Sequence, residues 1–78
     1  MNSMLKLYQF TDCPYCAKVR RKLEELQIEY EKIEVDPANK PDVVIELGGT
    51  VPVIDDDGHV MNESDDIVMY LEKKYGSI

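Results

Sequence analysis

Two cysteines, Cys13 and Cys16, stand three residues apart in the segment TDCPYCAK, and the chain has no others. A cysteine thiolate is both a nucleophile and a metal ligand, so the pair could be half of a metal site, a structural disulfide or a redox couple. A tetrahedral zinc site needs four ligands, and the chain adds only one histidine, His59, to the two cysteines. We therefore predict no metal site within the chain.

The composition indicates a small globular protein in a reducing compartment. Its 78 residues allow one domain, residues 1–78, and 44% hydrophobic with 32% charged residues is ordinary for such a domain. The net charge of −7 argues against a nucleic-acid partner, because phosphate binding needs a basic face. We find neither a signal peptide nor an apolar run near the roughly 20 residues of a membrane span. We expect no membrane association and a cytoplasmic location, which argues against a permanent disulfide.

The cysteines lie where a strand is predicted to meet a helix. Residues 4–10 (MLKLYQF) form an apolar, aromatic-rich run that is typical of a strand with both faces covered. Pro14 is suited to the first turn of a helix, where its missing N–H costs nothing. The apolar positions that recur at helical spacing after it are Cys16, Val19, Leu23 and Leu26. This pattern predicts Cys13 just outside the helix and Cys16 in its first turn, on the apolar stripe.

The rest of the chain predicts the element order β-α-β-α-β-β-α. After the first helix we expect a strand over 29–35, a short helix over 42–47, strands over 50–54 and 59–62, and a last helix with Ser64 as its N-cap and two aspartates in its first turn. Asp57-Gly58 between apolar strands indicates a hairpin. Pro52 cannot donate to a strand ladder, so it must lie at a strand start or an edge. We predict an α/β fold in which a four-stranded mixed sheet is flanked by three helices.

A redox couple is the use that this position favours. A helix N-terminus stabilises negative charge, and therefore the thiolate of Cys13. Cys16 should be less exposed and less acidic, and the spacing of three puts both sulfurs on the same side of a helical turn. We expect Cys13 to attack a disulfide and Cys16 to resolve the product. The carboxylate of Asp12 opposes the thiolate. The basic side chains that could offset it are Lys18, Arg20 and Arg21.

The segments CPYC at 13–16, TVP at 50–52 and SDD at 64–66 together make the chain resemble the glutaredoxins, a family with the thioredoxin fold. The resemblance covers residues 4–75 and implies thiol–disulfide exchange, with glutathione as reducing co-substrate and no permanently bound cofactor. It implies that Cys13 is the nucleophile and Cys16 the resolving cysteine. It also implies a cis Pro52 and a glutathione site. The residues it assigns to glutathione are Tyr15, Val51 and Pro52, with Ser64 and Asp65 at the γ-glutamyl end.

Two departures from the glutaredoxin pattern concern glutathione binding. Phe10 stands where the family has a lysine for the glycine carboxylate of glutathione, and we expect Lys40 to take that role. Asn62-Glu63 replace a glycine pair, and Glu63-Ser64 is similar to the N-terminal domain of glutathione transferases, as is the whole stretch 51–76. Glu63 therefore joins the predicted glutathione residues. A transferase would continue into a helical domain, so we do not expect transferase activity from these residues alone.

Three functions are compatible with this reading. The first is a monomeric dithiol glutaredoxin that reduces disulfide-bearing or glutathionylated proteins. The second keeps the chemistry but is recharged by a thioredoxin-reductase-type flavoenzyme, because Phe10 and Asp12 weaken the electrostatics for anionic glutathione. The third is a non-catalytic module that binds glutathione or carries an iron–sulfur cluster. By resemblance, Pro14-Tyr15 between the cysteines suits cluster bridging less well than a monothiol site does.

Overall fold

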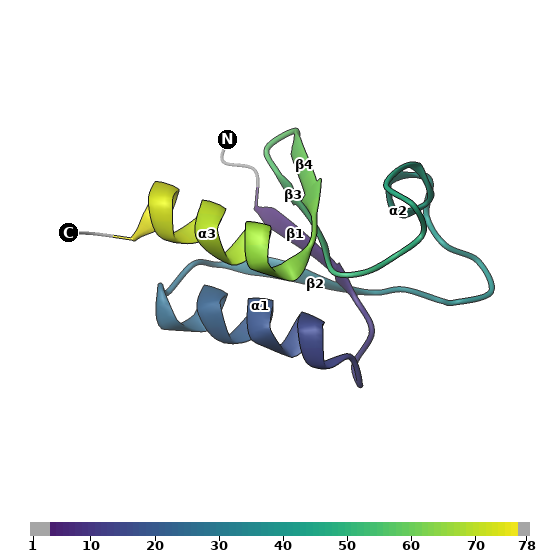
Figure 1. The fold of residues 1–78 in the computed structure, drawn as a ribbon, viewed down its shortest axis with the longest axis horizontal. Coiled ribbons are helices and arrows are strands. Elements are labelled where there is room, and N and C mark those ends of the chain that lie inside the picture. Colours follow the sequence, from purple (N-terminus) through teal and green to yellow (C-terminus); the bar gives the residue numbers. More distant parts are fainter. Residues whose placement is uncertain (1–3, 77–78) are drawn as a thin grey trace.

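The computed structural model describes residues 4–76 and places the elements in the predicted order (Figure 1). They are β1 (Leu5–Gln9), α1 (Pro14–Glu25), β2 (Tyr30–Glu34), α2 (Asp42–Glu46), β3 (Val53–Asp56), β4 (His59–Asn62) and α3 (Ser64–Tyr75). The strands form one mixed sheet in the order β2-β1-β3-β4, in which only the pair of β1 and β2 is parallel. The predicted α/β fold is confirmed. No helix in this part of the chain is long and apolar enough to cross a membrane.

The helices cover both faces of the sheet. α1 and α3 lie side by side (Figure 1) and pack on one face. Their core consists of Leu5, Leu7, Val19, Leu23, Ile54, Ile67 and Leu71. On the other face, Val44 of α2 packs with Val35 and Val53. Successive strand residues point to opposite faces, so Val53 and Ile54 serve the two cores in turn. The apolar run at 4–10 is thus covered on both sides, as its composition predicts.

The strand predicted over 50–54 starts three residues later and ends two residues later than predicted. It begins at Val53, because Pro52 has no N–H to donate to the ladder. The Val51–Pro52 peptide bond is cis, as the resemblance implies. The strand continues to Asp56, and the turn that follows is Asp57-Gly58, whose φ angles are 54° and 94°. Two positive φ angles suit the tight turn of a hairpin, so the predicted hairpin is present with its turn at Asp57-Gly58, as predicted.

The prediction that Ser64 is the N-cap of the last helix is wrong. Ser64 is the first residue of α3, and Glu63 is the N-cap. The chain turns sharply at Glu63, whose φ is 71°, and its carbonyl oxygen already accepts a hydrogen bond from the N–H of Ile67 at 2.9 Å. The helix therefore begins one residue earlier than predicted. Ser64 becomes 8% exposed as a result, instead of standing outside the helix.

A buried carboxylate at the end of β3 ties the sheet to α3. Asp56 is 5% exposed and accepts hydrogen bonds from the Tyr70 hydroxyl at 2.6 Å, the Tyr75 hydroxyl at 2.9 Å and Lys74 Nζ at 2.9 Å. Burial would raise the pKa of Asp56, but these donors outweigh it and hold the pKa below its usual value. The ring of His59 stacks on Tyr70 with the centroids 4.8 Å apart. The last turns of α3 are thereby fixed to the β3–β4 hairpin.

We expect Asp56→Asn to lower the free energy of unfolding at pH 7 by about 1.5–3 kcal/mol, because hydrogen bonds to a charged, buried group are lost. The pKa of Asp56 is lower in the folded than in the unfolded state. Its contribution is therefore full above the ordinary carboxyl pKa of about 4 and is lost as the pH falls through the folded value. Urea unfolding of the wild type and of Asp56→Asn, at pH 7 and at pH 3, measures the contribution of Asp56 to the free energy of unfolding. A difference between the two proteins that is the same at both pH values contradicts the prediction.

Candidate active site

The junction between β1 and α1 carries both cysteines. Cys13 is the N-cap of α1 and is partly exposed, and its Sγ accepts a hydrogen bond from the backbone N–H of Cys16 at 3.4 Å. Pro14 is the first helical residue, as predicted. Cys16 lies in the first turn and is fully buried. One thiol therefore faces solvent at the end of a helix, while the other is shielded behind it.

Burial raises the pKa of the Cys16 thiol to about 12. The backbone of Phe10 and the charge of Arg20 lower this pKa, whereas the neighbouring Cys13 raises it further. Cys16 is therefore a protonated thiol at neutral pH. The expectation that Cys16 is the less exposed cysteine is confirmed.

A groove of about 370 Å³ lies beside the cysteine pair. It is lined by Tyr15, Thr50, Val51, Pro52, Glu63, Ser64 and Asp65. Tyr15 comes from the first turn of α1, the next three residues from the loop before β3, and the last three from the start of α3. The volume falls in the range of small-molecule sites. The structure thus brings together all of the predicted glutathione residues except Lys40.

The start of α3 gives one wall of the groove its polarity. A helix N-terminus presents free backbone N–H groups and the positive end of the helix dipole, which together attract a carboxylate. Ser64 stands at this position, and Asp65 follows on the exposed rim. Asp65 forms an ion pair with Lys18 of α1, which links the two helices across the mouth of the groove. The wall therefore offers sites for a negative and a positive group within one turn of helix.

Lys40 lies next to the groove without lining it. Its Nζ donates a hydrogen bond to the carbonyl oxygen of Gly49 at 2.8 Å, immediately before the loop at 50–52. Phe10, which occupies the position of the family lysine, packs with the core under α2. The role predicted for Lys40 therefore stays a prediction, and in the structure this lysine braces the loop that carries Val51.

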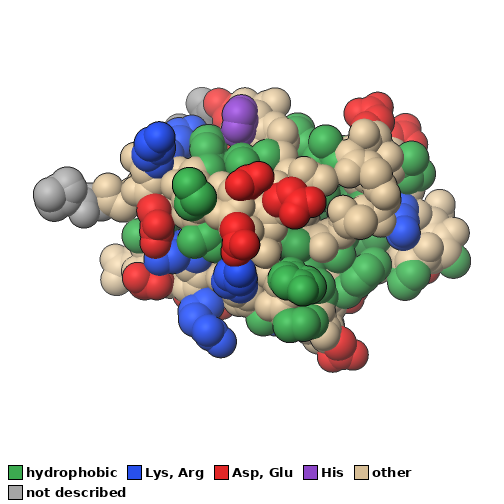
Figure 2. Space-filling view, viewed as in Figure 1, with side chains coloured by type: hydrophobic (Ala, Val, Ile, Leu, Met, Phe, Trp, Pro, Cys, Tyr) green, Lys and Arg blue, Asp and Glu red, His purple; other side chains and the backbone are tan. Residues whose placement is uncertain are grey.

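The basic side chains of α1 do not gather into one positive patch. Lys18 binds Asp65, whereas Arg20 turns toward the sheet and donates a hydrogen bond to Gln9. Figure 2 shows acidic side chains gathered over the start of α3, with a basic side chain directly beside them. The rim of the groove therefore carries both signs of charge.

A polar network behind the cysteine loop is not predicted by the sequence motifs. Glu34 of β2 accepts hydrogen bonds from the backbone N–H of Thr11 at 2.8 Å and from its hydroxyl at 2.7 Å. Gln9 donates to the same carboxylate at 3.0 Å and accepts from Arg20. One signal could have revealed it: Gln9 takes an inward-facing position of β1 where alternation calls for an apolar residue.

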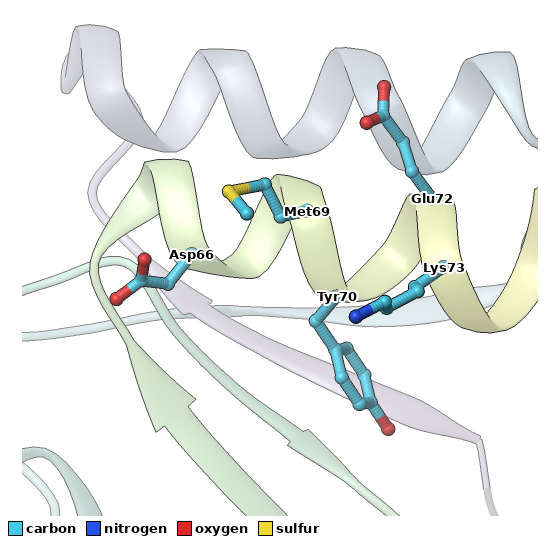
Figure 3. Close-up of a pocket in the computed structure, with 5 residues that line it drawn as sticks. All are labelled: Asp66, Met69, Tyr70, Glu72 and Lys73. Carbon is cyan, nitrogen blue, oxygen red and sulfur yellow. The ribbon is translucent and has the colours of Figure 1, made fainter.

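A second hollow, of about 550 Å³, lies along the outer face of α3 (Figure 3). It is lined by Asp66, Met69, Tyr70, Glu72 and Lys73. Glu72 points toward α1 in this view, where Lys22 binds it at 2.7 Å. The lining comes from a single helix and includes no nucleophile, so we do not assign chemistry to it. Among residues 4–76, no three Cys, His, Asp or Glu side chains meet as potential metal ligands.

This chain is similar to glutathione S-transferases and to a glutaredoxin. The family model described as glutathione S-transferase, N-terminal domain, matches residues 7–77. Glutathione S-transferase DHAR3 of Arabidopsis thaliana, a chloroplastic protein, is 39% identical over 66 residues, which cover 82% of this chain and 26% of that protein. Glutaredoxin 1 of Rickettsia bellii is 36% identical over 39 residues, which cover 50% of this chain and 40% of that protein.

Among solved structures, rice GST1 in complex with glutathione superposes with a TM-score of 0.88 at 27% identity, over 96% of this chain and 35% of that chain. The matched stretches thus cover about a quarter to two fifths of the length of these proteins. The predicted resemblance to both glutaredoxins and transferase N-terminal domains is confirmed.

We expect iodoacetamide at pH 7 to modify Cys13 in the folded, reduced protein and to leave Cys16 almost unmodified. Alkylation needs an accessible thiolate, and Cys16 is both fully buried and protonated at this pH. Peptide mass spectrometry measures the labelling of each cysteine. The control is the same reaction in urea, where both should react. Equal labelling of the two cysteines in the folded protein is the result that overturns the prediction.

Proposed function

Because this chain belongs to the family of glutathione S-transferase N-terminal domains, we propose that it binds glutathione and catalyses glutathione-dependent thiol–disulfide exchange, as a single glutaredoxin-like domain over residues 1–78. The observation that carries this proposal is the position of Cys13, a partly exposed N-cap thiol two residues before the groove-lining Tyr15 and backed by a second, buried thiol. Its proposed partners are glutathione and disulfide-bearing or glutathionylated proteins, on which it acts as a cytoplasmic monomer.

In the first step, the Cys13 thiolate attacks one sulfur of a protein disulfide or a glutathione mixed disulfide. A bond forms from Cys13 to that sulfur as the substrate S–S bond breaks, and the second substrate sulfur leaves as a thiolate that takes up a proton. The N-terminus of α1 favours the attacking thiolate. The backbone N–H of Cys16, which already donates to Cys13 Sγ at 3.4 Å, adds a hydrogen bond to it.

In the second step, Cys16 loses its proton and attacks Cys13 Sγ. The bond from Cys13 to the substrate sulfur breaks, and the substrate leaves as a thiol, so the substrate gains the two electrons that the dithiol loses. Two glutathione molecules then reduce the Cys13–Cys16 disulfide and leave as glutathione disulfide. Glutathione itself can also resolve the mixed disulfide in place of Cys16.

The groove suggests how glutathione is held. Val51 and Pro52, in the loop before β3, line the groove. The resemblance puts the cysteine moiety of glutathione against these two residues. Ser64 and the N-terminus of α3 suit its γ-glutamyl carboxylate. Asp65 suits the adjoining ammonium group, which must compete with Lys18 for the carboxylate. The pair is exposed, and such pairs contribute only about 0–1 kcal/mol, so a ligand can displace it at little cost.

One observation favours a second candidate, in which a flavoprotein reductase recharges the same disulfide. Among the described residues that line the groove there is no lysine or arginine, so the glycine carboxylate of glutathione meets no cation in the lining itself. Lys40 would have to leave Gly49 to reach it. Reduction of the oxidised protein by a thioredoxin reductase, with no reduction by glutathione, would favour this candidate.

Turnover of a glutathionylated peptide, with glutathione as reductant and glutathione reductase with NADPH as the reporter, tests the proposed function. We expect turnover with the wild type and a loss of at least about a hundredfold in Cys13→Ser, which lacks the nucleophile. Cys16→Ser should keep turnover, because glutathione resolves the mixed disulfide directly. No turnover in the wild type, or full turnover in Cys13→Ser, contradicts the proposal.

The charged side chains of Asp65 and Lys18 at the rim of the groove should affect the KM for glutathione more than kcat. We expect Asp65→Asn to raise the KM for glutathione about fivefold with kcat little changed, because it removes binding that ground state and transition state share. Lys18→Met should lower the same KM by up to about fivefold, since it removes a competitor worth no more than about 1 kcal/mol. Asp66→Asn is the matched control, since Asp66 is exposed but does not line the groove. Equal effects of the two Asp→Asn changes would exclude a specific role for Asp65.

A further inference from the structure

The polar network behind the cysteine pair has no part in the reaction as described so far. Gln9 is the third inward-facing residue of β1, after Leu5 and Leu7, and it is 1% exposed. An amide buried in an apolar core is destabilising unless it is fully hydrogen-bonded. A leucine would satisfy this position more simply, so the amide is expected to serve a purpose other than packing.

Both ends of the Gln9 amide are engaged. Its Nε2 donates to Glu34 at 3.0 Å, and its Oε1 accepts a hydrogen bond from Arg20. Glu34 is the register neighbour of Gln9 on β2 and also holds Thr11 through two hydrogen bonds. These hydrogen bonds from Thr11 lower the pKa of Glu34, so it is a carboxylate at neutral pH. The network therefore runs without a break from the loop before Cys13 to the guanidinium of Arg20.

Arg20 is one helical turn beyond Cys16. Residues four apart lie on the same face of a helix, so Cys16 and Arg20 share the face of α1 that turns toward the sheet. The hydrogen bond to Gln9 holds the half-buried Arg20 side chain on this face. From there its charge lowers the pKa of Cys16, in opposition to burial. The other titratable groups are Cys13, which acts on Cys16 from the same helix, and Glu34 of β2, which acts on Arg20.

We propose that Arg20, held in place by Gln9 and Glu34, is a positioning residue that stabilises the thiolate of Cys16 while it resolves the mixed disulfide on Cys13. The inference rests on the proposed function and concerns its second step alone. That step places a negative charge on a fully buried sulfur, which burial strongly disfavours. A fixed cation on the same helix face offsets this cost where the charge forms. The network thus serves resolution by Cys16 and leaves the attack by Cys13 unaffected.

Rapid mixing of the reduced protein with glutathione disulfide separates the two steps. Acid quenching and mass spectrometry follow first the glutathione adduct on Cys13 and then its loss as Cys16 resolves it. We expect Arg20→Met to slow the second step by about two- to fivefold at pH 7 and to move its pH profile to higher pH, because loss of the cation raises the pKa of Cys16 and lowers its thiolate fraction. In a Cys16→Ser background, which stops at the adduct, Arg20→Met should not change the rate.

Two further variants separate electrostatics from packing. Gln9→Leu places an apolar residue at an inward position and removes the acceptor that orients Arg20, so it should slow the same step. The double variant Gln9→Leu/Arg20→Met should resolve the mixed disulfide no more slowly than Arg20→Met alone, because Gln9 acts through Arg20. Arg21→Met is the matched control: it removes the same charge from the next residue of α1, which is exposed, and should leave both steps unchanged.

The outcomes are distinguishable. If the wild type forms no glutathione adduct, the proposed function fails. If the wild type completes both steps and Arg20→Met leaves the rate and pH profile of resolution unchanged, the inference about Arg20 is overturned while the function stands. If Arg20→Met does not fold, Gln9→Leu carries the test, and unchanged resolution in that variant overturns the inference.

Discussion

The burial of Cys16 against the core is the constraint on which the rest of the site depends. The first turn of α1 directs this thiol inward, which raises its pKa to about 12, and leaves Cys13 at the helix end in contact with solvent. The same spacing of three keeps the two residues close enough for a hydrogen bond from the backbone of one to the sulfur of the other. The chain thereby holds two cysteines with different environments within a single helical turn. The proposed dithiol reaction, in which Cys13 attacks and Cys16 resolves, rests on that difference.

Three connections between elements meet at one end of the sheet and together form the groove beside the two cysteines. β1 leads into α1, the cis Val51–Pro52 bond leads into β3, and β4 leads into α3 at Glu63. The opposite end of the sheet is fixed by the Asp56 network with Tyr70, Lys74 and Tyr75, which holds α3 to the hairpin. Anchoring α3 at its far end keeps its N-terminus beside the cysteines, where a helix N-terminus can bind a carboxylate.

Most of the structure that could be predicted from the sequence was predicted from short local motifs. Pro14, the hairpin glycine and the helical spacing of the apolar residues specify elements through short-range physics, so the element order and the cysteine junction were predicted correctly. The N-cap of α3 was misplaced because Ser64 is a good cap by composition, whereas the left-handed backbone of Glu63 decides where the helix starts. The hydrogen-bond partners of Gln9 and Lys40 could not be predicted, because side-chain contacts between distant segments depend on register and packing.

We propose glutathione as the natural reductant of a Cys13–Cys16 disulfide, and the reduction potential of that pair tests this proposal most directly. Equilibration of the protein in glutathione redox buffers, with the fraction of disulfide measured by mass spectrometry after thiol trapping, gives the potential. A value of about −200 to −230 mV, the range of glutaredoxins, is the predicted result. A pair that forms no disulfide in these buffers, or one with a potential near −270 mV as in thioredoxin, would contradict the proposal that glutathione is the reductant.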